Sequence, residues 1–336
     1  MRVLCCRPGL ENHLEREARA AGLTTGGAGA AGLVTADDGP ARPPGGWAFA
    51  DTVLENAAEV TGSSVNALAA ALVERFGAQI RGLEITGPWP CAFSAAGSEP
   101  GLARRAAAVQ EAFLELLRRR LGRLARLASL QRQPGRGPAA GLFVHFVAFD
   151  RAWVARAAWL GGQRRMADDP QAPSRSYLKV EEAYGLLDRQ PVAGQTVCDL
   201  GAAPGGWTWS AVRRGARVTA VDNGPLKGGA LGHPLVDHLR QDAFGFRPRD
   251  GQRFDWLFCD LVEEPHHVLR DIVGPWLAGR WCHRFVVVLK YGRTDPPALL
   301  EELRAPSSPL VRHAPGSVVA VLHHNREEFA VAGELR

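Results

Sequence analysis

From Thr196 onward, short apolar runs alternate with stretches of helical character, and this alternation limits the possible folds more than any other feature of the sequence. The runs predict strands at 196–200, 216–221, 236–240, 254–259 and 284–290, and the segments SVVAVLHH and EEFAVAGEL predict two closing strands. This is the spacing of β-α-β units, which fold into an α/β, doubly wound, mostly parallel sheet. Ligands of such sheets bind at the carboxyl ends of the strands, so functional residues are expected there.

The first half of the chain has a mixed α+β pattern. Residues 3–6 predict a strand and residues 9–22 a helix, and the glycine- and proline-rich stretch 26–46 predicts a loop. Helices are predicted over 56–77 and within 101–130, strands at 141–150 and 152–162, and a last helix at 177–189 after the loop 167–176. We therefore expect two domains, 1–170 and 171–336.

The excess positive charge lies in the first half. The net charge is +5, and residues 1–178 carry 21 basic and 16 acidic side chains, whereas residues 179–336 carry 19 of each. In the helix predicted within 101–130, Phe113, Leu117, Leu121 and Leu124 form an apolar stripe, and Arg119, Arg123 and Arg126 lie on the other side. These arginines form either a solvated helix face or a patch that faces RNA.

The six cysteines include no C-x-x-C pair, which argues against a zinc site or a disulfide framework. The first residues become charged too early for a signal peptide, and no apolar run approaches the roughly 20 residues of a membrane span. We expect a cytoplasmic protein without a membrane partner.

The segment VCDLGAAPGGWTWS joins the first strand of the alternating half to a helix through a glycine-rich turn. It lacks the Lys-Ser/Thr pair of a nucleotide triphosphate loop and the glycine spacing of a dinucleotide loop, and Pro204 removes a backbone donor. Asp199, Asp222 and Asp242 stand at or after three successive strands, where acids can bind a ribose diol and an adenine amine. A loop that avoids phosphate, together with these acids, predicts S-adenosylmethionine, although each acid alone could be a helix cap.

Two further predicted strands end at charged residues, an aspartate and a lysine. Asp260 and Lys290 end successive strands, Lys179 precedes the sheet, and Glu328 opens the last strand. The chain has 37 arginines and three lysines, so a retained lysine suggests chemistry that guanidinium cannot perform. The Asn/Asp-Pro-Pro-aromatic and Pro-Cys motifs of base methyltransferases are absent, and Cys259 is interpreted as a core residue.

In order and context, these four residues resemble the K-D-K-E tetrad of FtsJ-like ribose 2′-O-methyltransferases. The segments APSRSYLKVEEAY, DLGAAPGGWTW, VDNGPL, FCDLVEEP and NREEFAVAG are similar to those of the RlmM-type cytidine methyltransferases of 23S ribosomal RNA, and LCCRPGLENHLERE is similar to the start of domains associated with THUMP RNA-binding modules. The resemblance implies a Rossmann-like methyltransferase domain and Lys179, Asp260, Lys290 and Glu328 as catalytic residues, with Glu327 as the alternative acid. The residues expected to bind the cofactor are Ser176, Asp199, Gly201, Ala203, Pro204, Gly205, Gly206, Trp207, Asp222, Asp242 and Asp260.

The resemblance also implies a mechanism. Lys290 would act as the base toward a ribose hydroxyl, Lys179 would lower its pKa by like-charge repulsion, and Asp260 and Glu328 would orient the pair. No metal is expected, and the pairs His266-His267 and His323-His324 are interpreted as loop or sheet-edge residues. The expected partner is RNA, in particular 23S ribosomal RNA before full subunit assembly. Two alternatives stay open: another RNA, such as tRNA or an mRNA end, or a non-catalytic RNA-binding protein with a structural S-adenosylmethionine pocket.

Overall fold

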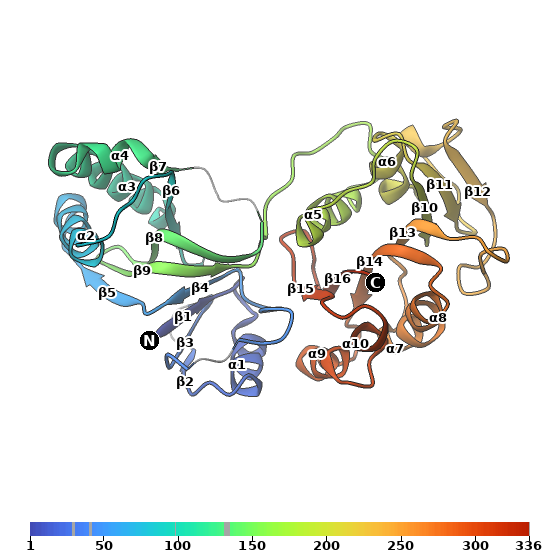
Figure 1. Ribbon diagram of the computed structural model, residues 1–336, viewed down its shortest axis with the longest axis horizontal. Coiled ribbons are helices and arrows are strands. Elements are labelled where there is room, and N and C mark those ends of the chain that lie inside the picture. Colours follow the sequence, from blue (N-terminus) through green and yellow to red (C-terminus); the bar gives the residue numbers. More distant parts are fainter. Residues whose placement is uncertain (29–30, 40–41, 98, 131–134, 336) are drawn as a thin grey trace. The chain divides into compact units, whose positions relative to one another are not determined.

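The computed structural model describes residues 1–28, 31–39, 42–97, 99–130 and 135–335 (Figure 1). The chain divides into two compact units, one made of residues 1–42 and 49–161 and the other of residues 43–48 and 162–336. The expected boundary at residue 170 lies between β9 (Arg151–Leu160) and α5 (Tyr177–Leu187). Among the described residues, no helix combines the length and the apolar character needed to cross a membrane.

The second unit is built on a seven-stranded sheet of order β12-β11-β10-β13-β14-β16-β15. The strands are β10 (Thr196–Leu200), β11 (Arg217–Val221), β12 (Val236–Leu239), β13 (Phe254–Cys259), β14 (Cys282–Lys290), β15 (Val318–Ala320) and β16 (Glu328–Glu334). The first five are parallel, and β16 runs antiparallel between β14 and β15. These pairings confirm the predicted mostly parallel sheet. The prediction was possible because continuous apolar runs are typical of strands buried on both faces.

Helices cover both faces of this sheet (Figure 1). On one face, α5 and α6 (Gly206–Val212) share a core with the strands, in which Tyr184 and Trp207 pack against Phe258. On the other side lie the short helical segments that follow β13 and β14. They are α7 (Pro265–Val268), the π-helical turn η2 (Leu269–Val273), α8 (Gly274–Ala278), α9 (Pro296–Arg304) and α10 (Pro309–His313), and the 3-10 turn η1 (Gly228–Ala230) follows β11.

The first unit has its own sheet, of order β2-β3-β1-β4-β9-β8-β6-β7, with β5 paired to β9. The strands are β1 (Arg2–Cys5), β2 (Thr25–Ala28), β3 (Leu33–Ala36), β4 (Thr52–Glu55), β5 (Ala58–Thr61), β6 (Trp89–Ala95), β7 (Ala128–Ser129), β8 (Gly137–Ala148) and β9; the helices are α1 (Glu11–Ala20), α2 (Val65–Gln79), α3 (Leu102–Arg120) and α4 (Gly122–Leu127). Helices α2 and α3 share one core with β5, β6, β8 and β9. The expected strand pair is found as the antiparallel pair β8 and β9.

Two predictions for the first unit are wrong because pairing with distant strands outweighs local sequence. The stretch 26–46, predicted as a loop, contains most of β2 and all of β3, and Leu33 and Val34 are buried where β3 pairs with β1. Positions 29–30 and 40–41 of this stretch lie outside the described residues. The helix predicted over 56–77 begins only at Val65, after an N-cap in which Ser64 accepts from Ala67, because residues 58–61 pair with β9 as β5.

The long amphipathic helix is also interrupted. Helix α3 ends at Arg120, and Leu121 leaves the helical conformation with φ −142° and 39% exposure, before Gly122 starts the short α4. Glycine is a poor helix former, which explains the break at this point. Phe113 and Leu117 are fully buried as predicted, but Leu121 is not part of the apolar stripe.

Candidate functional site

The four residues of the expected tetrad meet at one edge of the second sheet. Asp260 follows β13, and Lys290 is the last residue of its parallel neighbour β14. Glu328 is the first residue of β16, and because β16 is antiparallel, it lies directly opposite Lys290 in the strand register. Lys179 lies in the first turn of α5. Four positions up to 149 residues apart thus reach the same place.

Their side chains form a chain of ion pairs. Nζ of Lys179 lies 2.8 Å from Oε1 of Glu328 and 3.3 Å from Oδ2 of Asp260. Nζ of Lys290 donates to Oδ1 of Asp260 at 2.9 Å, so the two ammonium groups share one carboxylate, one on each oxygen. With two cations and two anions, the cluster has no net formal charge. The side chains are 5% to 25% exposed, so these pairs are screened much less than surface pairs.

The hydrogen bonds of Lys290 to Asp260 and Leu261 use two of the directions around its nitrogen. Nζ donates to Oδ1 of Asp260 and to the backbone carbonyl of Leu261, each at 2.9 Å. An amine nitrogen has four tetrahedral directions, one of which is its bond to carbon. When these two acceptors hold two N–H groups, the fourth direction carries the lone pair of the amine or the third proton of the ammonium. In either form Nζ can form one directed hydrogen bond to a hydroxyl group.

Of the two neighbouring glutamates, Glu328 is the one in the cluster. It is 4% exposed, and its Oε1 also accepts a hydrogen bond from Nδ2 of Asn325 at 3.2 Å. Glu327 is exposed, and its backbone carbonyl accepts from the amide of Tyr291. The geometry therefore favours Glu328 over the alternative Glu327 as the second acid of the tetrad.

The glycine-rich turn after β10 is shaped by contacts within the protein. Gly201 and Gly205 have φ values of 78° and 108°, in the left-handed region that favours glycine. A Cβ atom at Gly201 would lie 2.6 Å from Leu261, and one at Gly205 would lie 2.7 Å from Ala230. A larger residue at Gly205 would therefore disturb folding as well as any ligand, so a change at this position is a poor test of cofactor binding.

The two acids after β11 and β12 differ in their surroundings. Asp222 is half-buried and accepts from the backbone amides of Ala203 at 3.0 Å and Gly224 at 2.7 Å, which ties it to the glycine-rich turn. Asp242 is exposed, and its Oδ1 accepts from the amide of Phe244 at 3.1 Å. Each carboxylate oxygen has a second lone pair, so both acids can still accept from a ligand.

Asp199 lies beneath the turn and is 1% exposed. Its Oδ2 accepts from the hydroxyl of Thr208 at 2.6 Å. Burial raises the pKa of Asp199 to about 7, and the carboxylates of Asp260 and Asp222 add to the rise against the hydrogen bond from Thr208. The buried position of Asp199 explains why its pKa is raised to about 7.

The raised pKa predicts a specific dependence of stability on pH. The unfolded chain loses the Asp199 proton near pH 3.8, whereas the folded chain keeps it until about pH 7. Between these values the unfolded state binds fewer protons, so the contribution of Asp199 to the free energy of unfolding falls as the pH rises, and it is constant above about pH 7. The free energy of unfolding of Asp199→Asn and of the native protein is measured by urea denaturation between pH 5 and 8. The value of the variant minus that of the native protein should rise with pH up to about pH 7 and stay constant above it.

The exposed Asp237 in β12 provides the matched control. Replacing Asp237 with asparagine also removes one carboxylate, but at the surface. A difference for Asp199→Asn that does not change with pH would show that the folded protein holds this group ionised.

The expected cofactor residues Ser176 and Trp207 belong to the packing around the turn. The indole Nε1 of Trp207 donates to the backbone carbonyl of Ser176 at 3.0 Å, and the ring is buried in the core. The hydroxyl groups of Ser174 and Ser176 lie 2.7 Å apart. A Cβ atom at Gly206 would lie 2.6 Å from Oγ of Ser176, so this glycine lets the loop before α5 approach the start of α6.

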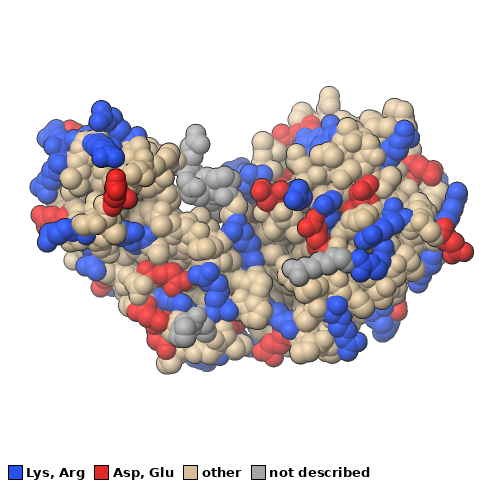
Figure 2. All heavy atoms as spheres, viewed as in Figure 1, with Lys and Arg blue, Asp and Glu red and all other residues tan. Residues whose placement is uncertain are grey.

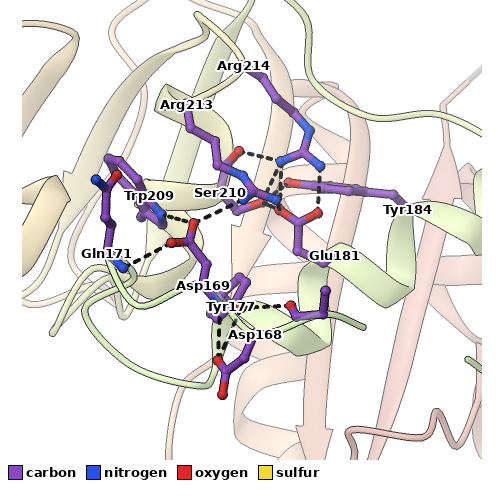
Figure 3. Close-up of polar contacts among 11 residues, drawn as sticks. Asp168, Asp169, Gln171, Tyr177, Glu181, Tyr184, Trp209, Ser210, Arg213 and Arg214 are labelled. Atoms are coloured by element: carbon purple, nitrogen blue, oxygen red, sulfur yellow. Dashed lines mark hydrogen bonds and ion pairs between the residues drawn. The ribbon is translucent and has the colours of Figure 1, made fainter. Parts of the chain in front are cut away.

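A network that the sequence did not indicate holds this loop in place (Figure 3). Asp169 accepts from the indole of Trp209 at 3.0 Å, the guanidinium of Arg213 at 3.1 Å and the amide of Gln171 at 2.9 Å. The hydrogen bonds from Trp209 and Gln171 hold the pKa of Asp169 below its usual value. Glu181 of α5 forms ion pairs with Arg213 and Arg214, which lie in the turn after α6. An acid in a polar loop gives no sequence signal that it will pair with a helix 40 residues later.

Among the residues that the structure describes, no group of three or more histidine, cysteine and acidic side chains could hold a metal ion. His266 and His267 lie in helix α7, so their interpretation as loop or sheet-edge residues is wrong. His323 and His324 lie in the turn after β15, where Glu182 accepts from both of their backbone amides. The six cysteines are free thiols in buried positions.

Comparison with known proteins agrees with this geometry. Residues 172–275 match the family model of FtsJ-like methyltransferases. The ribosomal RNA large subunit methyltransferase M of Laribacter hongkongensis is 43% identical over 185 residues, which cover 52% of this chain and 51% of that protein. The proteins of the same name from Halorhodospira halophila and Thauera aminoaromatica are 41% and 37% identical, over 52% and 56% of this chain and 51% and 54% of their own lengths. The chain thus spans about half the length of the curated relatives it matches, and the THUMP-like character of the first unit stays a prediction.

Proposed function

We propose that this chain, whose second unit carries an FtsJ-like methyltransferase domain, transfers methyl groups from S-adenosylmethionine to ribose 2′-hydroxyl groups of RNA. The observation that carries the proposal is the cluster of Lys179, Asp260, Lys290 and Glu328 at the carboxyl ends of β13 and β14, beside the glycine-rich turn. Parallel sheets of this kind bind their ligands at that edge. The tetrad supports sugar hydroxyl chemistry because it offers a lysine nitrogen to one hydroxyl group and neutralises its own charge.

The residues around the turn fit the cofactor. Asp222 would hold the ribose diol, Asp242 the adenine amine, and the backbone of residues 201–206 would pass close to the ligand. When bound, S-adenosylmethionine supplies a methyl group on a positively charged sulfur, which becomes neutral on transfer. The chain offers carboxylates to this ligand, which suits S-adenosylmethionine because this cofactor has a positively charged sulfur and no phosphate.

In the proposed reaction, the protein positions the hydroxyl and accepts its proton. In its uncharged amine form, Lys290 would be fixed by Asp260 and the Leu261 carbonyl and would direct its lone pair toward the 2′-hydroxyl. The hydroxyl proton would pass to this lone pair as the oxygen bonds to the methyl carbon and the bond between that carbon and sulfur breaks. Lys179 forms an ion pair with Oδ2 of Asp260, and Glu328 forms an ion pair with Lys179. Lys290 is thus the candidate catalytic residue, and the other three keep it in position.

The cofactor assignment predicts that Asp222→Ala weakens the binding of S-adenosylmethionine at least tenfold. A hydrogen bond from a ligand hydroxyl to a carboxylate contributes about 1.5–3 kcal/mol, and about 1.4 kcal/mol corresponds to a factor of ten. Isothermal calorimetry measures the affinity, and thermal unfolding checks that the turn, which Asp222 also holds through Ala203 and Gly224, remains folded. Asp237→Ala is the matched control, and equal affinities for the two variants would remove Asp222 from the cofactor site.

We further propose that the substrate is a cytidine of 23S ribosomal RNA, methylated in the cytoplasm before subunit assembly is complete. The relatives named for methylation of the large-subunit RNA support this choice. The first unit would bind the same RNA through the arginines of α3 and α4. Figure 2 shows basic side chains gathered over these helices, and Arg119, Arg123 and Arg126 are exposed. Only Arg119 among these three has an ion pair in the described residues, with Glu115 in the preceding turn.

Replacing Arg119, Arg123 and Arg126 with glutamine should weaken RNA binding and reduce its dependence on salt. Each lost contact to a phosphate of single-stranded RNA lowers the slope of log K against log salt by about 0.7. The matched control replaces the exposed Arg189, Arg217 and Arg249 of the second unit, which changes the net charge equally. If both triple variants bind RNA alike over the salt range, the arginines of α3 and α4 are a solvated helix face.

The complete proposal is tested by incubating RNA with the protein and labelled S-adenosylmethionine, followed by mass spectrometry of the nucleosides. We expect a 2′-O-methylcytidine in 23S ribosomal RNA. A methylated ribose found only in tRNA or at an mRNA end would support the same chemistry on another substrate. RNA binding without any methylated nucleoside would contradict the enzyme assignment and support a non-catalytic binding protein.

A further inference from the structure

A cavity of about 490 Å³ lies in the second unit, away from the glycine-rich turn. Its walls come from α7 and η2, which follow β13, and from α9, α10 and the turn between them, which follow β14. The volume falls in the range of about 300–1,000 Å³ that is typical of ligand pockets. The wall that α7 provides begins at Pro265, five residues along the chain from Asp260 of the tetrad.

Two arginines and two histidines stand at the rim of the cavity. Arg270, Arg312 and His313 line it and are exposed, and His266 lines it as well. The two ring nitrogens of His266 lie within hydrogen-bond distance of Glu264 and Glu302, and only the imidazolium form can donate to two carboxylates. The hydrogen bond to Glu264 raises the pKa of His266, and the contact with Glu302 adds to it.

The acids near the rim are already engaged by these cations. Glu302, which also lines the cavity, accepts from His266 at 2.8 Å. Arg270 forms an ion pair with Asp271 at 2.7 Å; the arginine side chain is 70% exposed and the aspartate side chain 37%, so solvent screens this pair. Arg312 donates through Nε to the carbonyl of Pro306 and carries further N–H donors on its Nη atoms. Arg312 thus has no carboxylate partner in the part of the chain that the structure describes, and the exposed Arg270 can exchange its pair with Asp271, so these two arginines can bind an anion.

The floor of the cavity is apolar. Leu269, Leu303 and Pro309 line it together with Gly274, and Leu303 is 2% exposed. Leu269 and Arg270 belong to the π-helical turn η2, a rare conformation that often occurs at functional sites. One irregular turn thus supplies both an apolar floor residue and a cationic rim residue.

We propose that this cavity binds a nucleotide of the RNA strand that flanks the methylated ribose. Its phosphate would bind Arg270 and Arg312, and its base would lie against the half-buried Leu269 and Pro309. The proposal rests on the proposed function, since it takes RNA as the substrate. Exposed arginines beside apolar side chains suit a nucleotide, because the arginines can bind its phosphate while the apolar side chains cover part of its base. Arginine is the residue best suited to phosphate oxygens.

The test is the double variant Arg270→Gln/Arg312→Gln in the full chain. RNA affinity is measured at several salt concentrations, and methyl transfer is measured in single turnover. We expect the Kd for RNA to rise at least tenfold, the salt slope to fall by about 1.4 for two lost contacts, and the rate at saturating RNA to stay within about twofold. A second variant, Ser307→Glu, adds a negative charge at the exposed rim and should also weaken RNA binding.

The matched control is Arg189→Gln/Arg217→Gln, which removes two exposed arginines near the amino ends of β10 and β11. If the native protein methylates RNA but the cavity variants bind RNA like this control, the cavity proposal is wrong and the proposed function stands. If the native protein yields no methylated ribose, both proposals fail. In a separate titration, cytidine 5′-monophosphate that binds the native protein and not the double variant, with unchanged RNA affinity, would assign the cavity to a free nucleotide and overturn the RNA proposal.

Discussion

Replacing Lys290 with arginine is expected to reduce single-turnover methyl transfer about 10²–10⁴-fold, the range in which a positioned general base contributes. Arginine keeps the positive charge beside Asp260, so the charge balance of the cluster and the binding of S-adenosylmethionine should be retained. A guanidinium stays protonated and has no lone pair to offer in the direction that Nζ of Lys290 leaves open. The loss should therefore fall on the chemical step alone.

The same substitution at Lys227 is the internal control. Lys227 is exposed before η1, and its backbone amide, which the substitution leaves unchanged, donates to the carbonyl of Pro204 at 2.9 Å. Lys227→Arg should be nearly silent. The comparison is made at saturating S-adenosylmethionine over a range of pH, with the binding of cofactor and RNA measured separately. Near-normal turnover of Lys290→Arg would mean that this residue supplies only positive charge, and the base role would have to be given up.

The second unit could be predicted from the sequence because its strands are buried on both faces. The run FVVVL of β14, residues 285–289, is apolar throughout and fully buried, so its position and its end can be recognised in the sequence, and all five parallel strands lie within two residues of the prediction. Strand ends then locate Asp260 and Lys290 at one edge. In the first unit, β3 and β5 are defined by the strands they pair with, and their own four residues carry too little information to show it.

The site was predictable only to the extent that strand ends define it. Lys179 comes from a helix outside the sheet, so its contact with Asp260 followed from the resemblance to a family and not from spacing. Gly201 and Gly205 were expected to bind the cofactor, and the sequence did not show that Leu261 and Ala230 also require glycine at these two positions. The loop contacts of Asp169 depend on tertiary structure, which no local pattern encodes.

Asp260→Asn is expected to reduce both activity and stability, because Asp260 is the one member that contacts both lysines. The neutral amide leaves Lys179 and Lys290 with only Glu328 as a charged partner, and the cluster changes from neutral to a net charge of +1. Breaking a fully buried ion pair costs about 3–5 kcal/mol; since these side chains are 12% to 25% exposed, we expect about 1–3 kcal/mol here. Methyl transfer should fall about 10²-fold or more, because Lys290 loses the partner that fixes its direction.

The double variant Lys179→Met/Asp260→Asn separates these two effects. It removes one cation and one anion, so Lys290 and Glu328 again balance in charge, and methionine fills part of the space of the lysine chain. In urea denaturation the double variant should lose less stability than the sum of the losses of Lys179→Met and Asp260→Asn, with a coupling of about 0.5–3 kcal/mol. Its methyl transfer should stay as low as that of Asp260→Asn, because restored charge balance does not restore the contact that orients Lys290. Recovery of activity together with stability would show that the cluster needs only neutrality, and additive losses of stability would show that Lys179 and Asp260 do not act as a pair.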